Sequence, residues 1–416
     1  MTTCVGILWA QYGPYHFARA AALTRAAAPV PVRALELAGQ TRDYQWWRPE
    51  RADVVTICPE GCAEGVSFWE VFRRTRRKLR ELRVNVCLLP SYSPAPSLAA
   101  LLAAKSLGIR AVMMNESHAG TARATGLAAL TKRRLVRLFD AALVGGAPQR
   151  RYFAALGLPE HKIFTGYDAV DNDYFAGEAE KVRADAAGWR RRYGLPAHYF
   201  LNLGRFVAKK NLETLIRAYG QFLRTAPSTQ THLVLVGSGD EEARLRELCS
   251  ELRLSVTDHG ATSSRENTTR GPGVHFYGFR QIDENPVFYA LAEAFILPSV
   301  REEWGLVVNE AMASGLPVVV SETAGCAEDL LEAAATDGGL QASASGTGSL
   351  ESRMRKNGFV FNPHSARELT EILLLLDSNP TLRQSMGRAG RQRIEKFSCA
   401  VFAENALGAS RAALNR

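Results

Sequence analysis

The stretch from Pro298 to Val320, PSVREEWGLVVNEAMASGLPVVV, sets carboxylates in and around a nearly all-apolar segment. Its pattern predicts a turn over REEWG, a short helix over LVVNEAMASG and a strand over LPVVV. The helix is apolar almost all round, which indicates that it is buried. Glu302 lies on the turn before this helix, and Glu310 lies inside it. Because a buried charge is costly without a partner, Glu310 needs a donor from outside the helix.

A second stretch, NLGRFVAKKN from Asn202 to Asn211, places cations where a predicted strand gives way to a helix. The strand ends at Gly204, Arg205 and Lys210 follow, and Asn211 is suited to cap the helix. A guanidinium and an ammonium beside a helix amino terminus attract a phosphate or pyrophosphate. Exposed surface cations are the alternative interpretation, and this stretch alone favours neither.

Short apolar runs alternate with helical patterns along the chain, which predicts parallel sheets covered on both faces. The alternation weakens over the polar segment 172–198 and then restarts. We therefore expect an α/β protein with two doubly wound, Rossmann-like domains, residues 1–185 and 198–395, followed by a helix within residues 396–416. Ligands of such domains bind at the carboxyl ends of the strands, and the cleft between two domains is the default site.

The composition is that of a soluble globular protein, with 46% apolar and 22% charged residues among 416. No apolar run has the length of a membrane-spanning helix, and the first residues are typical of a strand and helix, so we expect a cytoplasmic protein. Seven scattered cysteines argue against a disulfide framework. The pair Cys58 and Cys62 has no second pair at zinc-ligand spacing, so we expect no metal site there.

The formal net charge of +9 favours anionic partners such as nucleotides or acidic lipid headgroups. Much of the excess lies in RRTRRKLRELR, Arg73–Arg83, where Leu79 and Leu82 fall on one side of a helix. A solvated helix face is the interpretation we favour, and a peripheral dock on an anionic membrane surface is the alternative. We expect no nucleic-acid partner, because zinc-finger spacing and aromatic–basic RNA-binding signatures are both missing from the sequence.

The two stretches together have a more specific meaning than either alone. Arg205 and Lys210 supply positive charge for a diphosphate, and the predicted helix that begins near Gly305 supplies backbone N–H donors. Glu302 and Glu310 supply acceptors for hydroxyl groups. This combination suits a nucleotide-activated sugar, although an ion pair with a neighbouring arginine would also satisfy Glu310.

Other nucleotide motifs are weak or missing. VGSGDEE, residues 236–242, has Gly237 and Gly239 but lacks the third glycine of a dinucleotide fingerprint. The sequence contains no phosphate loop of the Gly-x4-Gly-Lys-Ser/Thr type, no His-Glu-x-x-His metal motif and no Gly-x-Ser-x-Gly elbow.

LPSVREEWGLVVNEAMASGLPVVVS resembles the nucleotide-sugar signature of the retaining family-4 glycosyltransferases of the GT-B fold, with the E-x7-E spacing from Glu302 to Glu310. LGRFVAKKN resembles their phosphate-binding element, and LVGSGDEEARL, VHFYGF and NGFVFNP follow in the expected order. The resemblance covers most of Tyr199–Arg393. It implies two Rossmann-like domains facing each other across a cleft, with the helix in residues 396–416 crossing back onto the first domain.

The resemblance also implies roles for the residues of the two stretches. Arg205 and Lys210 would hold the donor diphosphate and stabilise the leaving group, Glu310 would bind the ribose hydroxyls, and Glu302 would contact the transferred sugar. Such enzymes usually need no metal or other cofactor, because cationic side chains and helix dipoles stabilise the charge.

Further site residues follow from the same resemblance. The backbone at Gly305 and Leu306 would meet the phosphates, and we place Gly237 among the substrate-binding residues. In the first half, AQYGPYHFAR has Gly13 as its only glycine, which we assign to close approach by donor or acceptor. In MMNESHAGT, His118 is the candidate for a histidine that touches the sugar, with Glu116 and Ser117 as alternatives.

The sequence thus predicts a retaining glycosyltransferase that moves a sugar from a nucleoside diphosphate to an acceptor hydroxyl. The acceptor would be a sugar, a lipid-linked molecule or a small molecule, in bacterial polysaccharide, glycolipid or glycosylated-metabolite synthesis. Two alternatives stay open: a pseudo-glycosyltransferase that couples cyclitols in natural-product assembly, and a non-catalytic nucleotide-sugar binding module.

Overall fold

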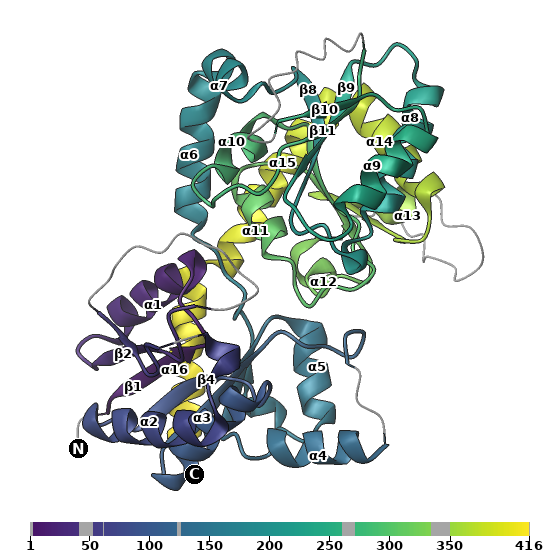
Figure 1. Cartoon of the computed structure of the whole chain (residues 1–416). Helices are drawn as coiled ribbons and strands as arrows, with labels where there is room; N and C mark the ends of the chain where they lie inside the picture. The colour runs from purple at the N-terminus through teal and green to yellow at the C-terminus, as the bar shows by residue number, and fades with distance from the viewer. Residues whose placement is uncertain are drawn as a thin grey trace, which may run out of the picture. The chain divides into compact units, whose positions relative to one another are not determined.

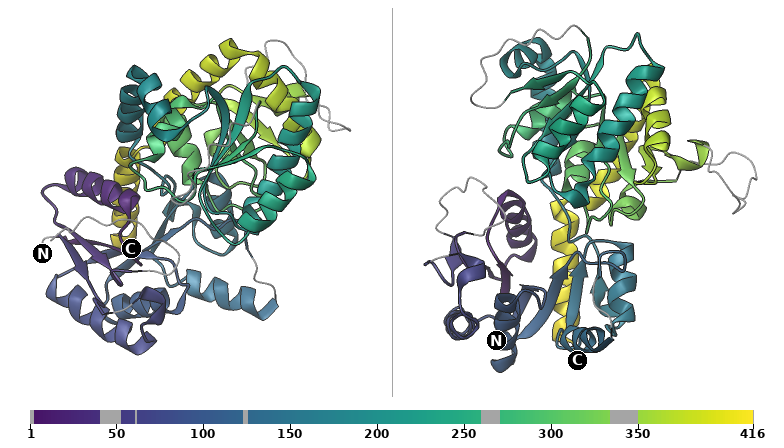
Figure 2. Two further views of the ribbon diagram at one scale, coloured as in Figure 1. Left: turned by 45° about the horizontal axis from the view of Figure 1, so that its top comes forward. Right: turned by 45° about the vertical axis from the view of Figure 1, so that its right-hand side comes forward.

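The chain folds into two units, each built on its own sheet. The structure, a computed structural model, describes residues 3–40, 53–60, 62–122, 126–259, 271–333 and 350–415. Contacts divide the chain into a first unit, Met1–Asp171 with Lys396–Arg416, and a second unit, Asn172–Glu395. In each unit helices cover both faces of a parallel sheet (Figures 1 and 2). The expectation of two doubly wound α/β domains is therefore confirmed.

The sheet of the first unit has seven strands within the described residues, all parallel, in the order β3-β2-β1-β4-β5-β6-β7. The order reverses between β1 and β4, which makes the carboxyl ends of these two strands the switch point where ligands of such sheets bind. The strands are β1 (Val5–Trp9), β2 (Val32–Glu36), β3 (Val54–Thr56), β4 (Val86–Pro90), β5 (Arg110–Asn115), β6 (Ala141–Val144) and β7 (Ile163–Phe164).

Two layers of helices sandwich this first sheet. Helices α1 (Pro14–Ala27) and α16 (Cys399–Leu414) share one apolar core with β1, through side chains such as Leu23 and Phe402. The core on the other face contains Val71, Ala100, Val136 and Phe153. These four come from α2 (Phe68–Glu81), α3 (Ala95–Ser106), α4 (Gly126–Val136) and α5 (Ala147–Ala155). Short 3-10 turns lie at η1 (Ala63–Gly65) and η2 (Glu160–Lys162).

The sheet of the second unit has eight strands within the described residues, in the order β10-β11-β9-β8-β12-β13-β15-β14, and only β14 runs antiparallel to its neighbour. The apolar runs of the sequence form its buried central strands, because a sheet covered on both faces needs apolar side chains on each. The strands are β8 (His198–Leu203), β9 (Thr231–Val236), β10 (Val256–Asp258), β11 (Val274–Phe276), β12 (Ala294–Leu297), β13 (Val318–Ser321), β14 (Met354–Arg355) and β15 (Gly358–Phe361).

The helices of the second unit follow the predicted apolar stripes. In α8 (Leu212–Thr225), the side chains of Leu215, Ile216, Tyr219 and Phe222 are all buried. The remaining helices are α6 (Asn172–Ala184), α7 (Ala186–Tyr193), α9 (Glu242–Glu251), α10 (Asn285–Leu291), α11 (Leu306–Ala313), α12 (Ala327–Leu330), α13 (Leu350–Arg353), α14 (Ala366–Ser378) and α15 (Pro380–Ile394), with 3-10 turns η3 (Ala208–Lys210) and η4 (Glu395–Phe397).

The boundary between the units differs from the one expected at residue 185. Helix α6 packs against α10 and α11, and so it belongs to the second unit. Phe175, Ala179 and Val182 form its buried stripe, and Arg183 donates hydrogen bonds to the carbonyls of Ala290 and Ser314. Residues 172–198 are mostly polar, and the buried stripe of α6 contains only one large side chain. The sequence pattern therefore did not predict that α6 packs on the second unit.

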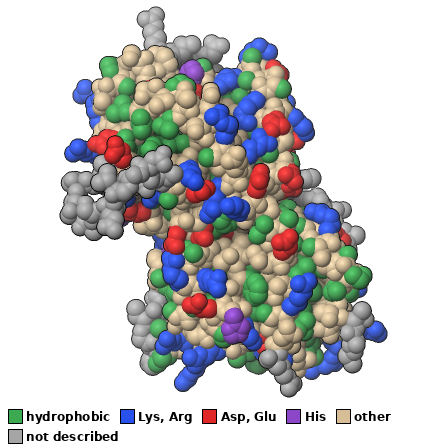
Figure 3. Space-filling model, turned by 180° about the vertical axis from the view of Figure 1, so that it is seen from behind, with side chains coloured by type: hydrophobic (Ala, Val, Ile, Leu, Met, Phe, Trp, Pro, Cys, Tyr) green, Lys and Arg blue, Asp and Glu red, His purple; other side chains and the backbone are tan. Residues whose placement is uncertain are grey.

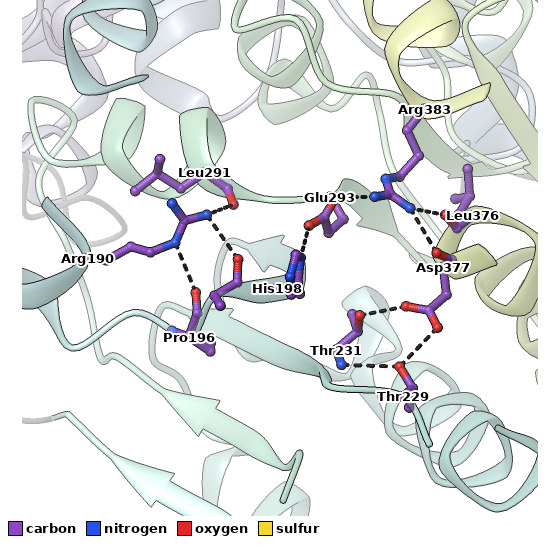
Figure 4. Close-up of polar contacts among 11 residues, drawn as sticks. Arg190, Pro196, His198, Thr229, Thr231, Leu291, Glu293, Leu376, Asp377 and Arg383 are labelled. Carbon is purple, nitrogen blue, oxygen red and sulfur yellow. Dashed lines mark hydrogen bonds and ion pairs between the residues drawn. The ribbon is translucent and has the colours of Figure 1, made fainter. Parts of the chain in front are cut away.

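A polar network closes the amino edge of the second sheet (Figure 4). His198, which begins β8, pairs with Glu293 at 2.7 Å, and Glu293 also pairs with Arg383 of α15 at 2.8 Å. Asp377 of α14 accepts hydrogen bonds from the hydroxyls of Thr229 and Thr231. These side chains connect strand starts to covering helices, which leaves the opposite, carboxyl edge as the place for ligand chemistry.

Candidate functional site

The turn after β8 presents the first candidate cation. Gly204 has φ +153°, and a Cβ there would meet nothing within 4 Å. Arg205 follows and its side chain is exposed at the carboxyl edge of the sheet. Lys210 ends η3, and Asn211 takes a left-handed conformation, φ 54°, before α8 begins. The strand-to-helix turn therefore carries Arg205 and Lys210 on the same connection, as the sequence predicted.

Asn211 does not cap α8 with its side chain, and that expectation is wrong. Its side-chain amide instead donates to the carbonyls of Pro298 (3.0 Å) and Pro363 (2.8 Å) and accepts from Thr214. Pro298 follows β12, and Pro363 lies two residues beyond β15. Asn211 thus ties three segments together at the carboxyl edge, a role that its place before a helix could not reveal.

Lys210 and Glu302 meet across 92 residues of sequence. Their side chains form an ion pair and are 14% and 10% exposed, so the pair is largely shielded from water. The Ser299 hydroxyl donates to the same Glu302 oxygen at 3.0 Å. Two donors on one carboxylate oxygen fix its orientation.

A second ion pair lies beside the first. Lys209 contacts Glu303 at 2.9 Å, and Arg301 approaches the other oxygen of Glu303 at 3.9 Å. Partial burial of Glu303 raises its pKa, but the hydrogen bond and charge of Lys209 outweigh this and lower the pKa below the ordinary value. Neighbouring residues of the two stretches therefore form parallel lysine–glutamate pairs.

The amino terminus of α11 adjoins the Lys210–Glu302 pair. Gly305 stands at the helix start with φ +109°, and a Cβ there would lie 2.9 Å from Leu297 and 3.4 Å from Cγ of Glu302. A glycine is therefore needed here both for its conformation and for its packing. Leu306, the first residue of α11, is partly exposed. Backbone N–H groups of the first turn of a helix favour an anion.

Glu310 lies deeper than its predicted neighbours. It sits in the second turn of α11 and is fully buried. The adjacent Asn309 accepts a hydrogen bond from the buried indole of Trp304 at 2.9 Å. The structure places Glu310 one turn beyond the amino terminus of α11. Its role toward ribose hydroxyls stays a prediction.

Gly237 has a packing reason to be glycine. Its φ is +139°, and a Cβ there would lie 1.9 Å from the carbonyl oxygen of Gly204. Gly239 likewise leaves room for the carbonyl of Phe206, at 2.3 Å. The backbone of the turn that carries Arg205 thus packs into the space that these two glycines after β9 leave.

Gly13 and His118 belong to the first unit. Gly13 begins α1, and its N–H donates to Nδ1 of His16 at 3.0 Å, while the imidazole lies 4.6 Å from the Trp9 ring. Burial, with a smaller contribution from Arg19, lowers the pKa of His16 to about 3. Nδ1 of a neutral imidazole is then an acceptor, and His16 serves to hold the start of α1.

His118 lies in the loop after β5 and is nearly buried. Its ring Nδ1 accepts a hydrogen bond from the backbone N–H of Gly120 at 3.2 Å. The backbone N–H of His118 donates to the hydroxyl of Thr121 at 3.1 Å. Since Nδ1 accepts this hydrogen bond, Nε2 carries the ring hydrogen in the neutral form. The loop geometry therefore fixes which ring atom of His118 could donate to a ligand.

A buried acidic group nearby was missed by the sequence analysis. Asp168 is fully buried and lies 4.0 Å from the equally buried Arg19. Burial and the charge of Glu116 raise the pKa of Asp168 well above its ordinary value, against the effect of Arg19. Glu116, an alternative to His118 in the sequence analysis, therefore interacts with a second carboxyl group. Nothing in GYDAVDND, where every acid has polar neighbours, identifies Asp168 as the buried one.

Residues 189–393 match the family model of the glycosyl transferases group 1. This segment is a glycosyl transferases group 1 domain. The group 1 domain includes the whole second sheet together with Arg205, Lys210, Glu302 and Glu310. The sequence resemblance, made on the same residues, is confirmed at this level.

Curated relatives of the chain include several named glycosyltransferases. A D-inositol 3-phosphate glycosyltransferase of Corynebacterium aurimucosum is 28% identical over 244 residues, which is 56% of this chain and 47% of that protein. The mannosylfructose-phosphate synthase of Agrobacterium fabrum is 30% identical over 162 residues, 39% of this chain and 32% of that protein. The matches thus span less than half the length of these two relatives.

Solved structures match over nearly the whole length of the chain. A glycosyltransferase from Rickettsia africae has a TM-score of 0.71 at 13% identity and covers 100% of each chain. Sucrose-phosphate synthase from Thermosynechococcus elongatus gives 0.68 at 16%, covering 98% of each. Anabaena HepE in complex with UDP and glucose gives 0.65 at 17%, covering 97% of this chain and 98% of that one. At these identities the likeness shows the fold, which is the GT-B fold of two Rossmann-like domains.

All seven cysteines are free thiols. No group of three or more His, Cys, Asp or Glu side chains in the described part of the chain is arranged to hold a metal ion. No described helix combines the length and apolar character needed to cross a bilayer.

Proposed function

We propose that the chain is a retaining glycosyltransferase that moves a sugar from a nucleoside diphosphate to an acceptor hydroxyl. The observation that carries the proposal is the carboxyl edge of the second sheet. There Arg205, Lys210 and the start of α11 gather beside Glu302, within a group 1 domain. Cations and backbone donors at one strand edge suit a diphosphate, and an ionised carboxylate beside them suits sugar hydroxyls.

The leaving diphosphate is the centre of the proposed mechanism. Cleavage of the sugar–phosphate bond builds negative charge on the departing oxygen, and oriented donors stabilise that charge. Lys210 has three N–H donors, so it can keep its bond to Glu302 and still reach a phosphate oxygen. Arg205, exposed on the same turn, would bind a second phosphate oxygen. Ion pairing with Glu302 therefore positions Lys210 for the diphosphate.

Glu302 would contact the transferred sugar in the same arrangement. Its carboxylate is held by Lys210 and Ser299, so it is oriented before the donor arrives. An ionised, fixed carboxylate accepts sugar hydroxyls and favours positive charge that develops on the sugar ring. In the first unit, we propose Gly13 and His118 for contact with donor sugar or acceptor.

The relatives support this donor and acceptor chemistry. HepE was solved with UDP and glucose, and other relatives are named for transfer to inositol 3-phosphate or to a phosphatidylinositol monomannoside. We propose a sugar, lipid-linked or small-molecule acceptor for this chain, with no metal cofactor.

Thermal stabilisation by uridine, guanosine, adenosine and thymidine diphosphates identifies the donor base. Turnover of the matching nucleotide sugar then separates catalysis from binding alone, and the anomeric configuration of the product tests retention. Bound nucleotide without turnover would support a non-catalytic binding module. A product that contains a cyclitol in place of a sugar would support the pseudo-glycosyltransferase alternative.

The adjacent lysine pairs offer a matched variant experiment. Lys210→Ala should lower kcat/KM about a hundredfold, because one oriented electrostatic contact contributes roughly 3 kcal/mol to the barrier. Lys209→Ala removes the same charge from a neighbouring ion pair and should change kcat/KM by less than tenfold. Equal losses in the two variants would contradict the assignment of Lys210 to the diphosphate.

A further inference from the structure

Helix α2 shows two chemically distinct sides. Ser67 caps its amino terminus by accepting the N–H of Glu70 at 3.2 Å. Val71, Thr75 and Leu79, at a spacing of four, are buried in the unit. The side turned away from the core carries Trp69, Arg73, Arg77 and Arg80, all exposed and spaced four, four and three residues apart. A cationic stripe with an indole at its start therefore runs the length of the helix.

Trp69 is the most exposed large hydrophobic side chain of the described residues. It is 67% exposed, while Phe68 and Phe72 beside it are partly buried. The Trp69 ring contacts both edge to face, with its centroid 5.3 Å from that of Phe68 and 6.0 Å from that of Phe72. An indole held in solvent by neighbouring rings offers a preformed apolar contact rather than a core residue.

The charge along α2 is not balanced. Arg73–Arg83 contains seven cations and a single acid, Glu81. Arg74 pairs with Glu70 at 2.6 Å and Lys78 with Glu81 at 2.9 Å, but Arg73 and Arg80 make no ion pair with a described residue. Elsewhere the two signs are mixed, as on the face in Figure 3, where Asp and Glu lie among Lys and Arg. Of the α2 stripe, Arg77 approaches Glu81 at 3.7 Å, while Arg73 and Arg80 lack an anionic partner within the described chain.

Helix α4 adds a second element of the same character. It lies on the same face of the first sheet, since Val136 of α4 and Val71 of α2 share one core (Figure 1). Leu130 of α4 is 53% exposed, and the side chains of Arg134 and Arg137 near it are exposed as well. Two of the four exposed large hydrophobic residues in the described chain thus lie on two basic helices of one face.

We propose that this face of the first unit, formed by α2 and α4, docks on an anionic lipid bilayer. The arginines would contact lipid phosphates, while Trp69 and Leu130 would enter the interface between headgroups and acyl chains. The positive charge of the arginines favours an anionic partner. The exposed side chains of Trp69 and Leu130 favour a partner with an apolar interior, as a bilayer has. This docking is argued from the first unit alone and is independent of the proposed glycosyl transfer.

Co-flotation of the full chain with vesicles tests the proposal without any activity assay. The chain should float with vesicles of phosphatidylcholine and phosphatidylglycerol, stay behind with phosphatidylcholine alone, and be released at high salt. Arg73→Gln, Arg77→Gln and Arg80→Gln combined should weaken binding by roughly a hundredfold, since each basic residue near the surface contributes about a factor of five. Trp69→Ala should weaken it roughly tenfold.

A charge-matched control separates this face from net charge. Arg224, Arg253 and Arg388 are exposed arginines of the second unit that make no ion pair with a described residue. Their combined change to glutamine removes the same charge and should leave vesicle binding within twofold of the parent. Equal weakening by both triple variants, equal binding to neutral vesicles, or no flotation at low salt would each overturn the proposal. So would binding to a nucleic-acid duplex that competes with vesicles and survives Trp69→Ala unchanged.

Discussion

At the scale of single residues, long-range pairing decides what each charged side chain can do. The sequence predicted Lys210 and Glu302 as site residues from two separate stretches. The structure adds that they form one ion pair, and that Lys209 and Glu303 form another. Local pattern shows which residues are charged, but it holds no information on partners 92 residues apart. The same limit explains Asn211, whose amide bonds to two distant carbonyls instead of its own helix.

The glycine at 237 tests how the cationic turn is supported. Gly237→Ala should lower the free energy of unfolding by about 3 kcal/mol, because the Cβ would clash with the Gly204 carbonyl at 1.9 Å and the backbone has φ +139°. Gly278→Ala is the matched control: it also has positive φ, +66°, but open space, so about 1 kcal/mol is expected. Urea unfolding measures both, and equal losses would show that the Gly204 turn moves aside without cost.

At the scale of elements, three neighbouring strands share a row of histidines. His232 of β9, His275 of β11 and His259 after β10 are linked by ring hydrogen bonds of 2.9 and 3.0 Å. His259 also stacks on Tyr277 at 4.0 Å, and Arg280 donates to the carbonyl of His259. Burial, aided by the charges of the other two histidines, lowers the pKa of His275 to about 3. Period-two patterns predict the strands, but they cannot show that these imidazoles are neighbours.

This row predicts a loss of stability in mild acid. An unfolded histidine binds its proton near pH 6.5, whereas folded His275 binds it near pH 3, so the unfolded state takes up the extra proton between these values. Stability is therefore complete above pH 6.5 and falls as the pH drops, by roughly 2 kcal/mol at pH 5 from His275 alone. Urea unfolding at pH 7 and pH 5 measures the slope.

His275→Asn should reduce that slope by the share of His275, while His364→Asn, at an exposed position of the same unit, should leave it unchanged. The explanation fails if the parent is equally stable at both pH values.

At the scale of the whole molecule, continuous apolar strands made the two sheets predictable, but the division of the chain was not. The expected boundary at residue 185 would leave α6 on the first unit. Its stripe contains one large residue, Phe175, between polar faces, so periodicity alone could not assign it to a partner. The contacts with α10 and α11 assign α6 to the second unit.

Two fragments test this division. Residues 172–395 should unfold in one cooperative transition, whereas residues 185–395, which keep α7 and its Asp185 cap, should be less stable by roughly 4 kcal/mol. The loss comes from exposing the α10 surface that covers Phe175 and Val182. Thermal and urea unfolding compare the two. If the two fragments were equally stable, α6 would be part of the connection between the domains and not of the second unit.

The first unit takes α16 from residues that follow the whole second unit in sequence. Phe402, Ala403 and Ala406 are completely buried in its core, and Val170 pairs with Ser398 where the chain returns. During translation, residues 172–395 leave the ribosome before this helix does. Until then, the part of the amino-terminal sheet that α16 covers stays exposed, although α1 already packs on the same face. The second unit can fold in the meantime, which reverses the usual order in which domains fold during synthesis.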